Sequence, residues 1–157
     1  MALPGHKASQ AVPTAGSEQV QPAGVDLRVA VVERLLEPGL LGRGNKEIPR
    51  GEMVEPSDGW WHLSPGGYRI RFEDVVEVPK DAVGICFPRS SLLRMGATLH
   101  CAVWDPGYKG RGQAFLVVHN PHGVRVEVGA RIAQIMFIRL EEKPGTLYRG
   151  SYYGEGL

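Results

Sequence analysis

The sequence predicts an all-β domain with one short helix, and three observations support this prediction. The chain has 157 residues, a length that suits one domain with a sizeable core. Its 21 glycines and 12 prolines are dispersed through the chain rather than repeated at a fixed period. They separate short apolar runs, and frequent turns between short apolar runs are typical of a sheet-rich domain.

The chain divides into three predicted regions. Residues 1–19 are rich in Ala, Pro, Ser and Gly and lack periodicity, so we expect a flexible N-terminal arm. The β domain is expected over residues 20–145, and residues 146–157 form a tail that contains Gly and Tyr and has no core pattern. Apolar runs bounded by turn residues predict strands at 25–34, 53–55, 60–63, 68–72, 75–78, 83–87, 99–104, 114–118, 124–128 and 132–140.

Two segments have more specific local patterns. Ser90–Arg94 is the helix candidate, because a serine is a favoured N-cap and Gly96 follows as a stop signal. Residues 68–72 alternate apolar and basic side chains, so we expect a half-buried strand with its arginines facing solvent.

Composition excludes several classes of function. The formal net charge is +1, so no global field favours a nucleic acid or a membrane as partner. The N-terminus lacks the apolar core of a signal peptide and no apolar run approaches a membrane span, so we expect a cytoplasmic protein. Cys86 and Cys101 lie in apolar runs, and the chain has neither a CxxC pair nor an HxE motif. We therefore expect buried, reduced thiols rather than a zinc site.

The most informative segment is Asp105–Gly110, which reads Asp-Pro-Gly-Tyr-Lys-Gly between two apolar runs. This pattern predicts two strands joined by a loop. A carboxylate held at a strand end can serve as a general base, and the ring of Tyr108 beside it can pack against a sugar. The simpler alternative is that Asp105 only stabilises the turn.

A second segment, Pro88–Arg94, has the chemistry of a phosphate site. The guanidinium of Arg89 offers a planar fork of donors, and Ser90 and Ser91 follow where a helix start exposes free backbone N–H groups. The alternative is an ordinary capped helix with a surface arginine.

Two further segments place polar side chains among apolar ones. Asp26, in Pro22–Leu27, needs a partner if it is buried: a metal, a phosphate-bound water or an arginine, or simply a salt bridge within the fold. Gln134, in Gly129–Gln134, has an amide that can reach a ligand or hydrogen-bond to neighbouring backbone.

These four segments, in this order and spacing, resemble the motifs of the dUTPase and dCTP deaminase superfamily. The similarity extends from about residue 20 to the C-terminus, and the order of all four motifs makes it specific. The resemblance implies a distorted β-barrel of jelly-roll type and a homotrimer whose active sites lie across subunit interfaces. It also implies that Tyr108 packs on the deoxyribose and leaves no room for a 2′-hydroxyl.

One position separates the two chemistries of the superfamily. Its deaminases use a glutamate three residues before an asparagine, and Asn120 places that position on Val117. No other acidic residue lies between Asp105 and Asn120. A valine cannot transfer protons, so the sequence favours hydrolysis of dUTP to dUMP and pyrophosphate.

Other features resemble the deaminases and keep alternatives open. Residues 105–107 and the tail at 152–156 look deaminase-like, and Arg111-Gly112 is an apparent insertion after the third motif. A dCTP deaminase, a bifunctional enzyme and a non-catalytic nucleotide-binding protein are the alternatives.

The resemblance implies a role for each candidate site residue. Asp105 would activate water for attack on the α-phosphorus, and Mg²⁺ would bridge the phosphate oxygens. Asp26 would support the metal–water shell. The residues expected to bind phosphates are Arg89, Ser90, Ser91, Arg94 and Gln134. In the tail, Arg149 would reach the γ-phosphate and Tyr152 or Tyr153 would stack on the base, unless the tail is a swapped strand or disordered.

Overall fold

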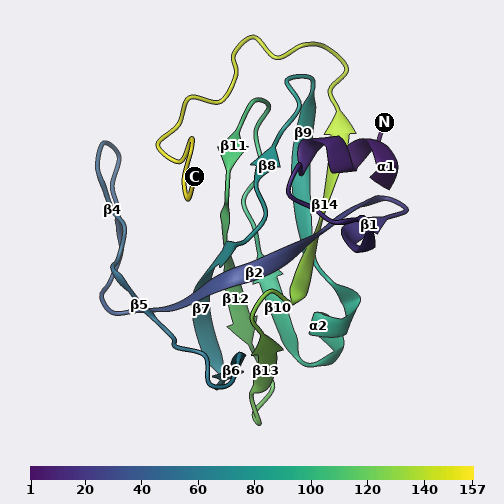
Figure 1. Ribbon diagram of the computed structural model, residues 1–157. Helices are drawn as coiled ribbons and strands as arrows, with labels where there is room; N and C mark the ends of the chain where they lie inside the picture. Colours follow the sequence, from purple (N-terminus) through teal and green to yellow (C-terminus); the bar gives the residue numbers. More distant parts are fainter.

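The computed structural model describes residues 1–157 and confirms an all-β fold with short helical segments only (Figure 1). The helices are α1 Gly5–Ala8 and α2 Ser90–Arg94, with 3-10 turns at Ser9–Ala11 and Ser17–Gln19. The strands are β1 Val20–Gln21, β2 Gly24–Leu35, β3 Leu40–Leu41, β4 Lys46–Glu47, β5 Gly51–Met53, β6 Trp60–Leu63, β7 Gly66–Phe72, β8 Val76–Glu77, β9 Ala82–Pro88, β10 Ala97–His100, β11 Lys109–Gly110, β12 Gln113–Val118, β13 Val124–Glu127 and β14 Arg131–Arg139.

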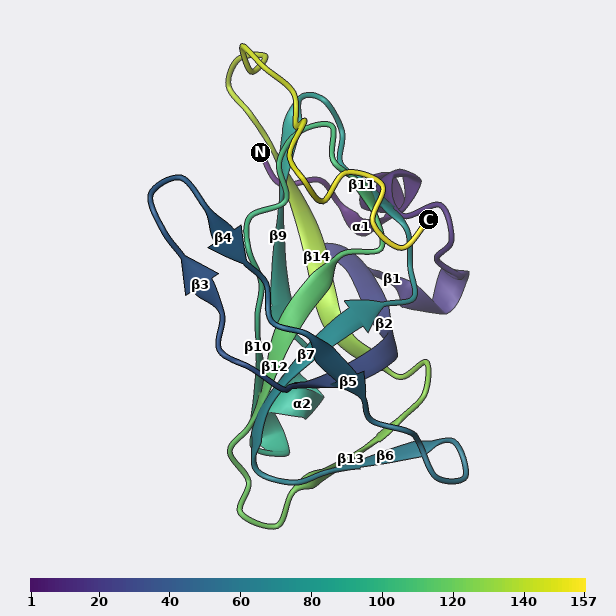
Figure 2. The same ribbon diagram turned by 90° about the vertical axis from the view of Figure 1, so that its left-hand side faces the viewer.

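The longest strand, β2, belongs to both halves of the main sheet, whose order is β10-β12-β7-β2-β14-β9. The first part of β2 pairs with β14 and the second part with β7, and the register shifts at a bulge in each pairing. Bulges bend a strand and increase its twist. Figures 1 and 2 show β2 crossing the molecule obliquely, so the antiparallel pairs wrap around one core.

The two ends of this sheet meet, which nearly closes the barrel. Gly84 on β9 and Trp104, shortly after β10, exchange backbone hydrogen bonds of 2.9 and 3.0 Å. A side chain at Gly84 would meet the Cβ of Trp104 at 2.9 Å, so a glycine allows this close approach. The bridge also fixes the chain immediately before Asp105.

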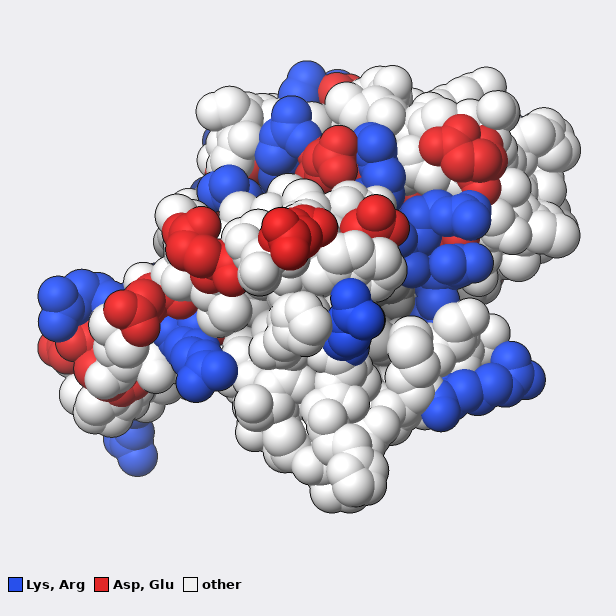
Figure 3. All heavy atoms as spheres, turned by 60° about the horizontal axis from the view of Figure 1, so that its bottom comes forward, with Lys and Arg blue, Asp and Glu red and all other residues white.

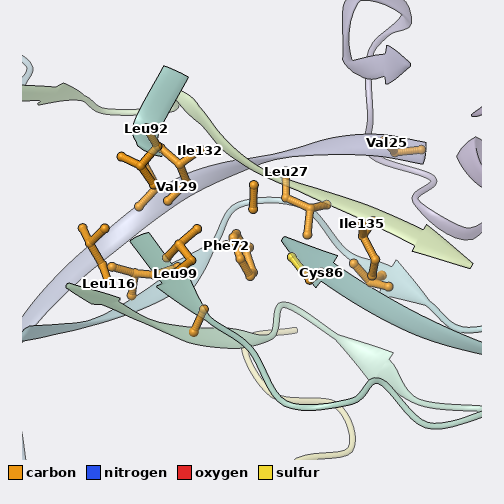
Figure 4. Close-up of a cluster of buried hydrophobic side chains, with 14 of the residues drawn as sticks. Val25, Leu27, Val29, Phe72, Cys86, Leu92, Leu99, Leu116, Ile132 and Ile135 are labelled. Atoms are coloured by element: carbon orange, nitrogen blue, oxygen red, sulfur yellow. The ribbon is translucent and has the colours of Figure 1, made fainter. Parts of the chain in front are cut away.

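The core is filled from every strand of the main sheet. Figure 4 shows Leu27, Phe72, Leu92 and Ile135 pointing into one cluster, although they come from β2, β7, α2 and β14. Phe72 and Ile135 are fully buried. Burial alternates along β7, as the period-two pattern of residues 68–72 predicted, and it also alternates along β9.

The helix prediction is confirmed in position but wrong in its cap. Arg89, not a serine, has the extended backbone of the N-cap, and Ser90 is the first helical residue. No side chain caps this helix. Gly96 ends it as predicted, with φ of +80° and its N–H donated to the carbonyl of Leu93 at 3.0 Å.

The segment 1–19, which the sequence led us to expect as a flexible arm, packs against the sheet. Ala8, Ala11 and Val12 are buried, and the N–H of Leu3 donates to the carbonyl of Phe137 at 2.8 Å. The expectation missed this packing because the anchoring side chains are small and follow no periodic pattern.

A buried polar network holds the end of that segment. The carboxylate of Asp74 is fully buried and accepts hydrogen bonds from Gln19 Nε2 at 3.1 Å and from two nitrogens of Arg28, N at 2.8 Å and Nη2 at 2.7 Å. The neighbouring N–H of Val75 donates to Thr14 Oγ1 at 2.9 Å. A charge this deeply buried is stable only when its partners satisfy it.

The arginines of β7 are not simply solvated, which corrects the expectation for residues 68–72. Arg69 Nε lies 2.6 Å from Glu33 Oε2 on β2. Arg71 is half-buried, and its Nε is a buried nitrogen without a hydrogen-bond partner.

Charged side chains of both signs lie on the surface, and the two cysteines lie at or near the core. Figure 3 shows acidic and basic side chains close together across one face. Cys86 is buried and Cys101 is half-buried, and both are free thiols. No helix has the length and apolarity needed to span a membrane.

Candidate active site

A cavity of about 390 Å³ lies beside the loop between β10 and β12. Aromatic rings, carboxylates and an amide line it together, from the loop, the tail and the segment before β5. The lining residues are Ile48, Ala102, Val103, Trp104, Asp105, Tyr108, Gly112, Gln113, Tyr148, Tyr152 and Glu155. Such a mixture of apolar walls and a few polar groups is typical of a small-molecule site.

The loop holds Asp105 in a tight turn. The N–H of Tyr108 donates to the carbonyl of Asp105 at 3.1 Å, and Gly107 supplies a φ of +83° that other residues rarely adopt. Val78, beside β8, donates to the carbonyl of Tyr108 at 2.9 Å and accepts from Gly107 at 3.1 Å. The Asp105 side chain is exposed at the edge of the cavity, where water can reach it.

Tyr108 is clamped by neighbouring rings and is 7% exposed. It makes edge contacts with Trp104, with ring centroids 5.3 Å apart, and with Tyr148 at 5.5 Å. Its hydroxyl donates to Glu155 Oε1 at 2.8 Å. Burial, reinforced by this hydrogen bond, raises the pKa of Tyr108 far above its usual value, so the phenol stays neutral.

The tail docks on the loop of its own chain, as Figure 2 shows near β11. Three backbone hydrogen bonds hold it: Tyr148 to Pro106 at 2.9 Å, Gly154 to Lys109 at 2.8 Å, and Arg111 to the carbonyl of Glu155 at 2.8 Å. The structure therefore brings Tyr152 into the cavity that contains Asp105.

Arg149 lies elsewhere. It lines a different cavity of about 820 Å³, together with Lys80 and Tyr153, and does not line the cavity that contains Asp105. Of the three tail residues named from the sequence, only Tyr152 lines the cavity that contains Asp105.

A second cluster forms where β2, β9 and β14 pair. Asp26 is 1% exposed, and its Oδ2 lies 3.0 Å from Arg89 Nε and 3.4 Å from Arg131 Nη1. Gln134 is opposite Asp26 on β2 and opposite Phe87 on β9. The first, second and fourth motifs therefore meet at one place, and the partners of the buried Asp26 are arginines.

Burial dominates the electrostatics of this cluster. It raises the pKa of Asp26 above 3.8, although the charges of Arg89 and Arg131 act in the opposite direction. The side chains of the two arginines remain about one-third exposed, at 31% and 34%. They can therefore bind an anion while Asp26 holds them in place.

Arg131 is the site residue that the sequence analysis did not select. Its only signal is its place in the fourth motif, three residues before Gln134. The Nη1 of Arg131 also donates to the carbonyl of Glu18. Ser90, Ser91 and Arg94 are exposed on α2, and their side chains make no hydrogen bond or ion pair within the chain.

The two clusters lie at opposite ends of β9. The Gly84–Trp104 bridge is antiparallel, so the chain beyond Trp104 runs away from Arg89. At roughly 3.3 Å per residue, the backbone at Asp105 lies about 20 Å from that at Arg89. One chain therefore does not bring Asp105 together with Arg89 and Gln134.

Val117 lies where the family resemblance places the glutamate of the deaminases. It lies on β12, half-buried and paired with Thr98 and Gly67. β12 reads Gln-Ala-Phe-Leu-Val-Val and has no acidic side chain. The second carboxylate of the cavity comes instead from the tail, as Glu155.

Comparisons with known proteins agree with these motifs. The family model described as dCTP deaminase-like matches residues 5–140. A protein of Aeropyrum pernix, named probable deoxyuridine 5′-triphosphate nucleotidohydrolase, is 56% identical over 138 residues, which cover 88% of this chain and 87% of that protein. Proteins with the same name from Methanococcoides burtonii and Archaeoglobus fulgidus are 39% and 42% identical; each alignment covers 88% of this chain, and 84% and 83% of theirs.

A solved structure has the same fold. A 2′-deoxycytidine 5′-triphosphate deaminase from Agrobacterium tumefaciens superposes with a TM-score of 0.65 at 21% identity. The match covers 87% of this chain and 47% of that chain, so this chain spans about half the length of that protein. With its motifs, its fold and these relatives in agreement, the chain belongs to the dUTPase and dCTP deaminase superfamily.

Proposed function

We propose that this chain is a dUTP diphosphatase, which hydrolyses dUTP to dUMP and pyrophosphate. The observation that carries the proposal is Val117, which stands where a deaminase of this superfamily needs a proton-transferring glutamate. The names of the relatives from three organisms support the same activity. Glu155, the other carboxylate in the cavity, is already engaged by the hydroxyl of Tyr108.

Asp105 is the proposed general base. Its carboxylate is exposed on a turn that backbone hydrogen bonds hold rigid, as a base that orients water must be. It would take a proton from water as that water attacks the α-phosphorus, and pyrophosphate would leave. Tyr108, held at the same cavity, would pack on the deoxyribose.

The phosphate-binding role belongs to the second cluster. Arg89 and Arg131 present partly exposed guanidinium groups beside Gln134, and oligophosphates are recognised by such forks of donors. We assign Asp26 the role of positioning both arginines, in place of direct support of a metal–water shell, because its carboxylate is buried between them. The exposed phosphate-binding candidates on α2 are Ser90, Ser91 and Arg94.

The donor set fits magnesium that arrives with the substrate. The chain contains no group of three or more His, Cys, Asp or Glu side chains that could cage a metal ion. Mg²⁺ in nucleotide enzymes keeps several waters and binds through substrate phosphates and one or two carboxylates. The substrate phosphates and water can therefore supply the ligands of the ion, which leaves Asp105 free to act as the base. When bound, the ion neutralises charge on the phosphate oxygens.

A homotrimer with composite sites would resolve the separation of the two clusters. The α-phosphorus must lie beside both the water on Asp105 and the phosphate-binding arginines, yet one chain holds these about 20 Å apart. A second copy can supply Arg89, Arg131 and Gln134 to the Asp105 cavity of the first.

An apolar face is available for this assembly. On β9, Val83 and Ile85 are half-buried and Phe87 is 56% exposed. They lie opposite Ile138, Met136 and Gln134 of β14, so one face of this pair is mostly apolar and incompletely covered. Burial of such a face between copies would stabilise the oligomer.

Mixing of two inactive variants tests the composite site. Asp105→Asn and Arg89→Ala each remove one half of the site. If the halves come from different copies, co-refolded mixtures should regain activity that neither variant has alone. Mixtures that stay inactive while forming mixed oligomers would refute the composite site.

The tail is proposed to act as a lid. Tyr152 lines the cavity and would stack on the base, whereas Arg149 would reach a γ-phosphate only at another site or after the tail moves.

We place the protein in the cytoplasm, because free thiols such as those of Cys86 and Cys101 persist in reducing compartments.

Product analysis tests the proposed reaction. Purified protein is incubated with Mg²⁺ and either dUTP or dCTP, and the nucleotides are separated by chromatography. We expect dUMP and pyrophosphate from dUTP, with no deamination of dCTP. Deamination of dCTP would support the deaminase, and nucleotide binding without turnover would support a non-catalytic binding protein.

A further inference from the structure

Glu155 is the tail side chain that reaches the hydroxyl of Tyr108. The two groups are far apart in sequence, yet the hydroxyl donates to Glu155 Oε1 at 2.8 Å and both residues line the cavity that contains Asp105. Glu155 lies in the deaminase-like ending at residues 152–156, which gave it no role of its own, and the proposed reaction gives it none either.

The backbone around Glu155 is shaped for this contact. Gly154 on one side donates to the carbonyl of Lys109, and the carbonyl of Glu155 accepts from Arg111, both at 2.8 Å. A Cβ at Gly110 would lie 2.7 Å from the Tyr108 hydroxyl and 3.1 Å from the Glu155 carbonyl oxygen. A side chain at position 110 would therefore collide with both residues, so the contact between Tyr108 and Glu155 depends on a glycine there.

A positive charge lies near the Glu155 carboxylate. Burial raises the pKa of Glu155, whereas the hydrogen bond from Tyr108 and the charge of Arg71 lower it. The Nε of Arg71 is the buried nitrogen that lacks a hydrogen-bond partner, and its Cδ lies against Gly156. The charge of Arg71 therefore stabilises the Glu155 carboxylate, while the hydroxyl of Tyr108 donates to its Oε1.

The clamp on the Tyr108 ring depends on the tail. Trp104 contacts one edge of the ring from within the loop, while Tyr148 and Glu155 contact it from the tail. A ring that must exclude a hydroxyl group discriminates only when it cannot tilt, because small displacements in a site have large effects on rate.

We propose that Glu155 is a specificity-determining positioning residue: it fixes the ring of Tyr108 against the sugar, so that a ribonucleotide is excluded while the tail is docked. This inference rests on the proposed function, in which Tyr108 packs on the deoxyribose. It assigns the C-terminal tail a part in sugar selection in addition to closure over the nucleotide.

The test compares dUTP and UTP as substrates. The ratio of kcat/KM for dUTP to that for UTP is measured for the natural chain, Glu155→Ala, Glu155→Gln, Tyr108→Phe and the Glu155→Ala/Tyr108→Phe double variant. Glu142→Gln is the matched control, because Glu142 is an exposed acid with no partner in the chain. Thermal melting verifies that each variant folds.

We expect Glu155→Ala to lower the dUTP preference by at least about tenfold, mainly through faster use of UTP. Glu155→Gln keeps an acceptor for the hydroxyl and should retain part of the preference. Tyr108→Phe should match Glu155→Ala, and the double variant should lose no more than either, because all three remove one hydrogen bond. An unchanged ratio in a folded Glu155→Ala variant would overturn the inference.

A binding measurement separates this inference from the proposed function. If the natural chain hydrolyses no dUTP, the proposed function fails, and calorimetry with the non-hydrolysable α,β-imido analogues of dUTP and UTP takes the place of kinetics. A preference for the deoxynucleotide that disappears in Glu155→Ala but persists in Glu142→Gln would support the positioning role. Equal preference in all three proteins would overturn it.

Discussion

Asp74 and Glu73 are adjacent acids that both pair with Arg28, but only one of them is buried. The Asp74 side chain is fully buried, whereas the Glu73 side chain is 41% exposed, with Oε1 3.2 Å from Arg28 Nη1. Asp74 also accepts a hydrogen bond from Gln19, which is itself fully buried. Substitution of each acid by alanine therefore compares a buried and an exposed partner of the same arginine.

The structure sets the expected magnitudes. Removing one partner of a buried ion pair costs about 3–5 kcal/mol, whereas an exposed pair contributes about 0–1 kcal/mol. Because the side chain of Arg28 is 27% exposed, water can solvate part of the charge that loses its partner in Asp74→Ala. We therefore expect Asp74→Ala to lower the free energy of unfolding by about 3–4 kcal/mol and Glu73→Ala by at most about 1 kcal/mol. For a domain of this size, the larger loss lowers Tm by about 6–16 °C.

Urea denaturation followed by circular dichroism measures the free energy of unfolding of both variants. All samples are kept at one protein concentration, because oligomerisation changes apparent stability. Hydrogen exchange adds a local readout: Asp74→Ala should reduce the protection of residues near Gln19 more than the protection of the core strands. If the two variants lose the same free energy within about 0.5 kcal/mol, the buried network does not anchor the N-terminal segment as we argue.

Three further predictions follow from the site. Asp105→Asn should abolish dUTP turnover while calorimetric binding of α,β-imido-dUTP stays nearly unchanged; substantial residual activity would exclude Asp105 as the base. Deletion of residues 149–157 should raise KM or lower kcat for dUTP, and unchanged kinetics would contradict the lid. Burial raises the pKa of Asp26 above 3.8, so the folded chain binds this proton more tightly than the unfolded chain, and stability falls as pH rises from about 3.8 through the folded-state pKa. Asp26→Asn should remove that pH dependence from urea denaturation curves, and an unchanged profile would contradict it.

Much of the fold could be predicted because β propensity and turn chemistry agree along the chain. The alternation in β7 and the apolar runs of β9 and β14 match their observed burial. Residues 105–108 lie in the predicted loop, where Gly107 adopts the positive φ that this turn requires, whereas Lys109–Gly110 forms the short strand β11, which was not predicted. Where local preference and tertiary packing coincide, the sequence is sufficient.

What could not be predicted depends on contacts between distant segments. The packing of residues 1–19 relies on Asp74, whose role is invisible without the fold. Arg71 seemed to face solvent by alternation, yet the tail covers it through Gly156. Glu155 enters the cavity only because the tail folds back onto the loop, and no local periodicity encodes that path.

We propose that this chain hydrolyses dUTP by attack of water on the α-phosphorus, with Asp105 as the base. In the most direct measurement, the reaction is run in water enriched in oxygen-18, and both products are analysed by mass spectrometry. We predict that the label enters dUMP and not pyrophosphate, and that Asp105→Asn forms neither product. Label in pyrophosphate would place the attack on another phosphorus, and conversion of dCTP without release of pyrophosphate would show that the chain is a deaminase.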